Sequence, residues 1–318
     1  MNKHLLCLTV DTDPDGLSGK VTDRQTLKWR GLETLQTLPA EIHALPKLGS
    51  IPITWFIRAD GQLESILGSA SYLLEKFERF WATANNNGHE LAWHPHLYRQ
   101  ASPEDDALII SDPNEAQEEL ERLWDKLRGV LPTTSFRHGE GWHTPRTYAT
   151  VEKLGFHCDS TAIPNRKGGN GHPMNWTGAP NQPYFPDFVN LCAAGTERGL
   201  LELPMNTWLV QAPYDGAPRL RYINPAVHPH LFANALQNWE NARQFSSTDL
   251  CVWVMIFHPD EVLPAEREDD LYARSPTALF RNLISFQESL RQADIEVEWV
   301  TIGEAAKMWR RSRLRQIA

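Results

Sequence analysis

One short segment guides the interpretation of the whole chain: residues 88–98 read Gly-His-Glu-Leu-Ala-Trp-His-Pro-His-Leu-Tyr. Its apolar run at 91–93 predicts a buried strand, and His94 and His96 follow directly. In an extended chain, residues two apart point to the same face, so both imidazoles can converge on one point. Imidazole is the commonest metal ligand among side chains. A histidine cluster on one strand is also compatible with a hydrogen-bonded surface feature, so the rest of the chain has to decide.

The surrounding sequence alternates between predicted strands and predicted helices. Apolar runs that end in polar residues predict strands at 4–10, 52–57, 91–93, 133–137, 156–158, 200–204, 251–257 and 295–300. The spacing of apolar residues predicts helices at 63–84, 114–128, 144–155, 225–243 and 275–292, and a last helix from 301. Such alternation is typical of an α/β fold with a parallel sheet.

The chain organisation indicates one catalytic unit. A length of 318 residues is within the range of a single α/β barrel, and no linker divides the sequence, so we predict one domain over residues 1–318. Gly, Asn and Pro dominate residues 161–198, which predicts a long loop, and a loop of this length inside a compact domain is usually functional. The basic segment 309–318 is expected to be a frayed tail.

Composition excludes several classes of protein. The formal net charge is −9 and the pI is about 5.7, which argues against a nucleic-acid partner. The four cysteines lie far apart without a Cys-x-x-Cys pair, so they are expected to be small buried side chains. No run of about 18 apolar residues predicts a membrane span. The apolar run near the N-terminus is too short for a signal peptide, so a cytoplasmic location is expected.

Polar residues that can take part in catalysis or metal binding follow several of the predicted strands. In parallel α/β folds, ligands bind beyond the carboxyl ends of the strands. The acidic residues after the first strand could also form an ordinary solvated Asp-Pro-Asp-Gly turn, but their recurrence with other groups at strand ends indicates one shared site. The residues concerned are Asp11, Asp13, His94, His96, Arg137 and His258.

These residue types together are suited to the hydrolysis of a carbonyl compound. A carboxylate and two imidazoles can hold a catalytic divalent ion that keeps positions open for water and substrate. Such an ion polarises a carbonyl and lowers the pKa of a bound water. A second carboxylate can accept a proton as general base, an arginine can hold that carboxylate in place, and a further histidine can protonate the leaving group.

Four segments resemble the sequence motifs of the polysaccharide deacetylases, which are carbohydrate esterases with NodB homology. Residues 9–13, Thr-Val-Asp-Thr-Asp, resemble the first motif, and 88–94 resemble the second. The third is similar to 136–141, Phe-Arg-His-Gly-Glu-Gly, and the last is similar to 255–259, Met-Ile-Phe-His-Pro. The resemblance extends from about residue 4 to 308, and implies a distorted (β/α) barrel of about seven strands. The Leu-Glu-Leu-Pro run at 201–204 also indicates a divergent, intracellular-type branch.

The resemblance also implies a role for each of these residues. Asp11 would be the catalytic base, and Arg137 would pair with it. Asp13 and His94 would be metal ligands, and His258 would be the general acid. The cofactor implied is one divalent metal ion, with zinc expected.

Two positions depart from the family pattern. The second histidine ligand usually lies four residues after the first, where this chain has Tyr98. His96 is the expected substitute, whereas His89 fits a structural role at the start of the strand. The acid that often precedes the tryptophan of the fourth motif is here Asn175. An amide carries no charge to raise the pKa of the catalytic histidine, so another acid, such as Asp159 or Asp187, would have to serve, or that effect is absent.

The sequence therefore predicts a metal-dependent deacetylase, a hydrolase of non-peptide carbon–nitrogen bonds. The expected substrate is an N-acylated amino sugar or glycan intermediate. Trp142, Trp176 and Tyr184 are candidate substrate-binding residues because aromatic rings stack on sugars; packing against the body of the protein is an equally compatible role. Two alternatives stay open: a hydrolase of a non-sugar amide on the same barrel, and a catalytically silent carbohydrate-binding relative.

Overall fold

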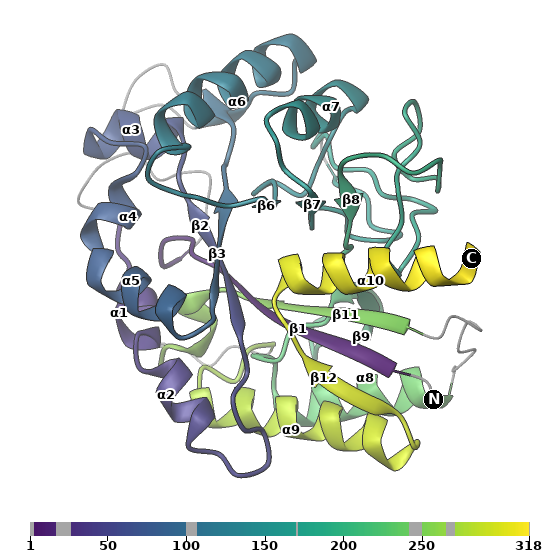
Figure 1. Cartoon of the computed structure of the whole chain (residues 1–318). Coiled ribbons are helices and arrows are strands. Elements are labelled where there is room, and N and C mark those ends of the chain that lie inside the picture. Colours follow the sequence, from purple (N-terminus) through teal and green to yellow (C-terminus); the bar gives the residue numbers. More distant parts are fainter. Residues whose placement is uncertain are drawn as a thin grey trace.

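The computed structural model of the chain describes residues 3–16, 27–99, 107–169, 171–241, 250–264 and 271–317. Its centre is a curled parallel sheet in the strand order β11-β1-β2-β3-β6-β7-β8, with β12 beside β1 (Figure 1). All the strands predicted from the sequence occur in it: β1 (Lys3–Asp11), β2 (Ile53–Arg58), β3 (Glu90–His94), β6 (Ser135–Phe136), β7 (Cys158–Asp159), β8 (Leu201–Glu202), β11 (Leu250–Phe257) and β12 (Glu296–Trp299). The fold is therefore α/β, with a curled half-barrel sheet that is consistent with the predicted distorted (β/α) barrel.

Strand β1 holds this sheet together. One of its edges pairs with β11 over almost its whole length, from Lys3 opposite Leu250 to Val10 opposite Phe257. Its other edge pairs first with β12 and then, from Leu8 onward, with β2. A strand with neighbours on both edges and packing on both faces must be apolar throughout, which explains the run that precedes Asp11.

The sheet does not close into a barrel by strand pairing between β8 and β11. Instead, polar groups of the intervening chain satisfy the free edge of β11. The backbone N–H of Val254 donates to Oδ1 of Asn206 (2.6 Å), and that of Val252 donates to Oε1 of Gln182 (2.9 Å). Buried backbone donors need such partners. The segments around Asn206 and Gln182 therefore cover the free edge of β11.

Two small antiparallel hairpins were not predicted. One joins β4 (Tyr98–Arg99) to β5 (Leu108–Ile109), and the other joins β9 (Thr207–Val210) to β10 (Arg219–Tyr222). The described residues of 161–198 form isolated bridges, such as Lys167 with Asn175, but no named helix or strand. Asn170 lies outside the described residues.

The described helices surround the curled sheet, except that α10 (Ile302–Ile317) crosses the middle of the view between β8 and β11 (Figure 1). They are α1 (Arg30–Leu35), α2 (Leu38–His43), α3 (Gly61–Leu67), α4 (Tyr72–Lys76), α5 (Glu78–Asn86), α6 (Pro113–Leu127), α7 (Pro145–Lys153), α8 (Pro229–Asn241), α9 (Pro276–Gln292) and α10 (Ile302–Ile317), with a short 3-10 helix η1 (Pro259–Val262). None of the helices within the described ranges combines the length and apolar character of a membrane-spanning segment.

Three predictions about helices need correction or comment. The single helix expected at 63–84 is divided into α3, α4 and α5, because Gly68 adopts a left-handed conformation (φ 85°) that ends α3. The basic segment from 309 is helical through Ile317 and is not the expected frayed tail: Arg310 in α10 donates to the carbonyl oxygen of Gly199 (2.6 Å). The predicted end of α8 at Arg243 lies outside the described residues.

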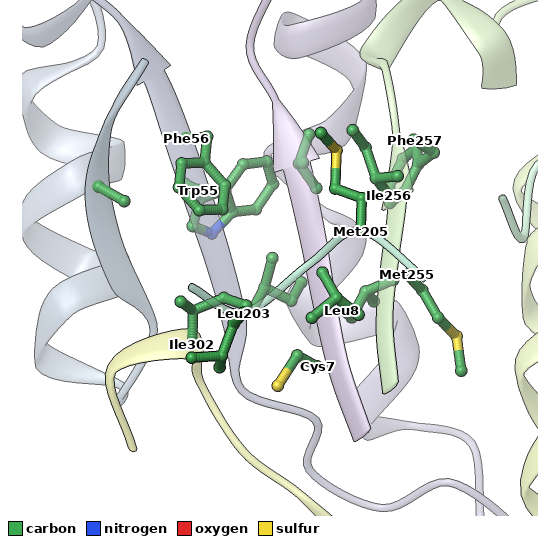
Figure 2. Packing of buried hydrophobic residues seen from close by; sticks show 14 of the residues in the cluster. Cys7, Leu8, Trp55, Phe56, Leu203, Met205, Met255, Ile256, Phe257 and Ile302 are labelled. Carbon is green, nitrogen blue, oxygen red and sulfur yellow. The ribbon is translucent and has the colours of Figure 1, made fainter. Parts of the chain in front are cut away.

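The core fills the interior of the half-barrel. Figure 2 shows Cys7 and Leu8 of β1 close to side chains of β11 and of the segment after β8, including Met205 and Ile256. All four cysteines are free, and Cys7, Cys158 and Cys251 are buried, as expected. The carboxyl end of this packed interior carries the polar side chains considered next.

Candidate active site

The polar strand ends predicted from the sequence meet at one edge of the sheet. In the strand register, Asp11 of β1 lies opposite Phe56 of β2, and Arg58 of β2 lies opposite His94 of β3. The carboxyl ends of β1, β2 and β3 are thus at one level. Arg137 directly follows β6, and His258 directly follows β11, so residues far apart in the sequence surround one point.

Asp13, His94 and His96 form a buried cluster with the composition of a metal site. One ligand atom from each lies within 4.8 Å of the others. The Nε2 atom of His96 is 2.9 Å from Oδ1 of Asp13, and Nε2 of His94 is 3.6 Å from Oδ2 of Asp13. The rings of the two histidines are perpendicular, with centroids 5.1 Å apart, so both Nε2 atoms face the same carboxylate.

The hydrogen bonds of the two imidazoles favour metal binding at Nε2. The Nδ1–H of His94 donates to the backbone carbonyl of Arg137 (3.0 Å), and that of His96 donates to Oε1 of Glu140 (2.8 Å). Within the described part of the chain, both Nε2 atoms are buried and make no hydrogen bond of standard geometry, although each lies beside a carboxylate oxygen of Asp13. A histidine whose Nδ1–H is fixed by an oxygen presents its Nε2 lone pair to a metal. These three residues therefore fit a divalent cation.

Contacts with neighbouring residues fix the position of the His96 side chain next to Asp13. Residue 139 is glycine, and a Cβ atom there would overlap the His96 ring. The backbone N–H of His96 donates to Oδ2 of Asp60 (3.2 Å), which fixes the chain after β3. The hydroxyl of Tyr98 donates to Glu140, the same carboxylate that holds His96. Tyr98 therefore supports the His96 side chain and does not itself contact Asp13.

The charges around Asp13 are balanced in the metal-free protein. Burial opposes its ionisation, but the imidazoles of His96 and His94 hold the pKa of Asp13 well below its usual range. The buried guanidinium of Arg58 is 3.5 Å from Oδ1 of Asp13 and 2.8 Å from Oδ2 of Asp60. Burial lowers the pKa of His96, but Asp13 and Glu140 together raise it to about 9. A metal ion must therefore displace a proton from His96 at neutral pH.

Asp11 is held by Arg137 beside this cluster. The guanidinium of Arg137 is fully buried and donates to Oδ1 of Asp11 (2.6 Å) and to the hydroxyl of Thr9 (2.9 Å). Its remaining donors bond to the carbonyl (2.9 Å) and hydroxyl (2.9 Å) of Ser160. The other carboxylate oxygen of Asp11, Oδ2, is 3.6 Å from Nε2 of His94. One oxygen of Asp11 is thus anchored, and the other faces the cluster.

His258 lies on the opposite wall of the site. Its Nε2 is 3.7 Å from Oδ2 of Asp13, and its Nδ1–H donates to Oε1 of Glu261 (3.1 Å). The side chain of Asn224 donates to Oε2 of Glu261 (2.7 Å) and fixes the carboxylate. Burial lowers the pKa of His258, but Glu261, Asp13 and Asp11 raise it to about 10. His258 is therefore a cation at neutral pH in the metal-free protein.

The acid that contacts His258 is Glu261, and not Asp159 or Asp187, which the sequence offered as candidates. The carboxylate of Asp159 instead faces His143 (3.0 Å) and the hydroxyl of Thr161. Asp187 accepts hydrogen bonds from the backbone of its own turn. Sequence reasoning also missed Glu140; the only available signal was that the third motif, which contains it, continues past Arg137. For Glu261, the signal was its spacing of three residues from His258 within one turn.

His89 and the aromatic residues have structural positions. The Nδ1 of His89 accepts a hydrogen bond from the backbone of Ile53 (2.9 Å), as expected of a residue that supports the start of β3. Trp142, Trp176 and Tyr184 are 1%, 2% and 4% exposed, respectively. The Trp176 indole donates to the carbonyl of Gly141 (2.7 Å). None of the three is on the wall of the cavity described below, and their role in substrate binding stays a prediction.

A cavity of about 370 Å³ opens beside the catalytic candidates. Its wall includes Asp11 and His258, together with Glu140, Arg166 and Tyr222. The cavity volume is within the range of small-molecule sites, which is about 300–1,000 Å³. A substrate in this cavity would therefore contact both Asp11 and His258.

Comparison with known proteins identifies the fold. No protein-family model and no curated protein sequence matches the chain. A solved structure from Mycobacterium smegmatis, described as a polysaccharide deacetylase, is 16% identical and matches with a TM-score of 0.52 over 98% of this chain and 92% of its own. A structure from Parabacteroides distasonis, described as a glycoside hydrolase/deacetylase, is 14% identical, with a TM-score of 0.57 over 97% of this chain and 71% of its own. The chain therefore has the polysaccharide-deacetylase fold that its four sequence motifs predict.

Proposed function

We propose that the protein is a metal-dependent hydrolase that removes an N-acetyl or similar acyl group from an amino sugar or glycan intermediate. The observation that supports this most directly is the cluster of Asp13, His94 and His96, in which two buried Nε2 atoms converge on one carboxylate. Two histidines and a carboxylate with open positions are a common ligand set of catalytic zinc. We propose zinc as the ion.

The chain's own groups can carry the proton transfers of amide hydrolysis. A divalent ion in the cluster would supply Lewis acidity and make a water more acidic. Asp11, anchored by Arg137 (2.6 Å), would accept the proton of the attacking water. His258, positively charged beside Glu261, would donate a proton to the departing nitrogen on the opposite wall. Asp11 would thus act as the base and His258 as the acid of one reaction.

The two departures from the family pattern are compensated, which weighs against a catalytically silent relative. His96, with Nε2 at 2.9 Å from Oδ1 of Asp13, would serve as the ligand where a histidine at residue 98 was expected. Glu261, hydrogen-bonded to His258, would provide the charge that Asn175 cannot.

Metal analysis and acetate release test the proposal. Wild-type protein should contain about one divalent ion per chain by mass spectrometry, and Asp13→Ala should contain none. Asp11→Asn should retain the ion yet lose about 100- to 10,000-fold in the rate of acetate release from N-acetylated sugars. Asp125→Asn, an exposed substitution on α6, is the matched control and should resemble the wild type. A metal-free wild type, or an unimpaired Asp11→Asn variant, would refute the proposed mechanism.

Hydrolysis of a non-sugar amide is the second candidate. It is favoured by the burial of Trp142, Trp176 and Tyr184, which leaves the cavity without the expected stacking residues. A panel of N-acetylated sugars and small N-acyl amines distinguishes the two candidates. Turnover of the acyclic amides alone would select the second.

A further inference from the structure

The charged side chains on the wall of the cavity beside Asp11 and His258 differ in whether a group of opposite charge contacts them. Both carboxylates on its wall are already neutralised by contacts. Asp11 pairs with Arg137 (2.6 Å). Glu140 accepts hydrogen bonds from His96 (2.8 Å), from Tyr98 and from His172 (3.3 Å).

Arg166 differs from these groups because its charge has no carboxylate partner. Its half-buried side chain lies on the cavity wall, and it forms no ion pair with any carboxylate of the described residues. The buried arginines Arg58, Arg137 and Arg198 all pair with carboxylates. A guanidinium has five N–H donors in a planar fork and stays charged at any physiological pH. Arg166 therefore brings free donors and a free positive charge to the site.

The loop that carries Arg166 is anchored on both sides. The backbone N–H of Arg166 donates to the carbonyl of Ile163 (3.0 Å), and its own carbonyl accepts from the backbone of Trp176 (2.8 Å). The N–H of Gly168 donates to the carbonyl of Met174 (2.8 Å). The buried Trp176 side chain fixes this loop to the body of the protein. Hydrogen bonds thus fix the backbone at Arg166, which reduces the conformational entropy lost when the Arg166 side chain binds a ligand.

The glycines after Arg166 shape the same wall. Gly168 and Gly169 both line the cavity. A Cβ atom at residue 168 would overlap His172, whose imidazole holds Glu140. The lack of a side chain at residue 168 therefore lets His172 pack against the loop and reach Glu140.

We propose that the substrate is an amide that carries an oxyanion, either a phosphate or a carboxylate, and that Arg166 binds this anion. This inference rests on the proposed function, because it assigns the scissile amide to the space between Asp11 and His258. Arginine binds carboxylates and phosphates with two parallel hydrogen bonds, which gives both affinity and orientation. A cavity of about 370 Å³ is large enough for a single charged sugar unit.

Binding of matched charged and neutral probes to zinc-loaded protein tests this inference. The probes are N-acetylglucosamine, its 1-phosphate and 6-phosphate, and N-acetylmuramic acid, titrated by calorimetry. At least one anionic probe should bind more tightly than the neutral sugar. Arg166→Gln should weaken that probe by about 10- to 100-fold, the effect of losing hydrogen bonds to a charged group, and should leave the neutral sugar unchanged.

Lys167→Gln is the matched control. It removes a positive charge from the same loop, but Lys167 is exposed and is not on the cavity wall. It should alter the affinity of the anionic probe by less than about twofold, as expected for a solvated charge. Direct coordination of phosphate to zinc would be insensitive to Arg166, so the comparison of the two variants excludes it. The preferred probe identifies the anion as phosphate or carboxylate.

The outcomes separate this inference from the proposed function. Equal affinity for charged and neutral probes, no binding of any probe, or the same effect in Arg166→Gln and Lys167→Gln would overturn the inference. Acetate release from the probes, together with an affinity for the anionic probe that falls no more in Arg166→Gln than in Lys167→Gln, would support the hydrolase function and refute the role of Arg166. An Arg166-dependent preference for anions without acetate release from any probe would support anion binding by Arg166 and refute the hydrolase function.

Discussion

Two histidines on opposite walls of the site, His96 and His258, illustrate two ways of fixing an imidazole. Each donates its Nδ1–H to a carboxylate: Glu140 at 2.8 Å for His96, and Glu261 at 3.1 Å for His258. Glu140 is 44 residues away in the sequence, whereas Glu261 is three residues away. The first pair depends on β3 and β6 being neighbours in the sheet, and the second forms within the turn of η1.

The proposed reaction uses these two similar pairs in opposite ways. Both imidazoles have a raised pKa in the metal-free protein, to about 9 for His96 and about 10 for His258. The proton of His96 must leave when a metal binds at Nε2. The proton of His258 must stay until the leaving nitrogen takes it. The same kind of hydrogen bond therefore supports a ligand on one wall and an acid on the other, and substitutions can distinguish them.

The largest effect is expected from removing the ligand histidine. His96→Ala should lose more metal affinity than the about 10- to 100-fold that loss of an outer hydrogen-bond partner costs, and activity should fall to background with it. Titration with a chromophoric zinc chelator measures the affinity. If His96→Ala bound zinc as tightly as the wild type, His96 would not be a ligand.

The second largest effect is expected at the acid histidine. His258→Ala should lose about 100- to 10,000-fold in kcat, the usual contribution of general acid catalysis, while retaining one zinc per chain. Kinetics and metal content measured on the same preparation check this. Loss of metal from His258→Ala would mean that the two histidines do not have separate roles.

A smaller effect is expected from breaking the long-range pair. Glu140→Gln removes the negative charge that holds His96 and should weaken zinc binding by about 10- to 100-fold. Glu261→Gln is the control, because it alters the other histidine and should leave zinc affinity unchanged. Equal zinc affinities in the two variants would contradict the role assigned to Glu140.

The smallest effect is expected from the local pair, and it depends on pH. His258 acts in its protonated form, so activity should fall as pH rises through its pKa. Glu261 raises that pKa, whereas a bound divalent ion acts in the opposite direction, so the wild-type decline lies below pH 10. Glu261→Gln should move the decline to lower pH, with near wild-type rates at pH 6 and reduced rates at pH 8. An unchanged pH–rate profile would exclude Glu261 from this role.

The sequence alone was sufficient for the parts of this protein that depend on local patterns. The apolar runs of β1 and β11 predicted buried parallel strands, because a strand covered on both faces must be apolar along its length. These two runs and the apolar run at 91–93 placed Asp11, His258 and His94 at strand ends, and parallel strands bring those ends to one edge. The distorted barrel of about seven strands was expected from the resemblance to the deacetylase motifs.

Only the tertiary structure decided which side chains face each other. The space left by Gly139 allows His96 to reach Asp13, and this space is created by the neighbouring strand. The pairing of Glu140 with His96 has the same origin. Burial of Trp176 depends on how the long loop folds back onto the barrel. Local patterns specify backbone direction and periodicity, whereas contacts between distant side chains depend on packing, which no single segment of the sequence contains.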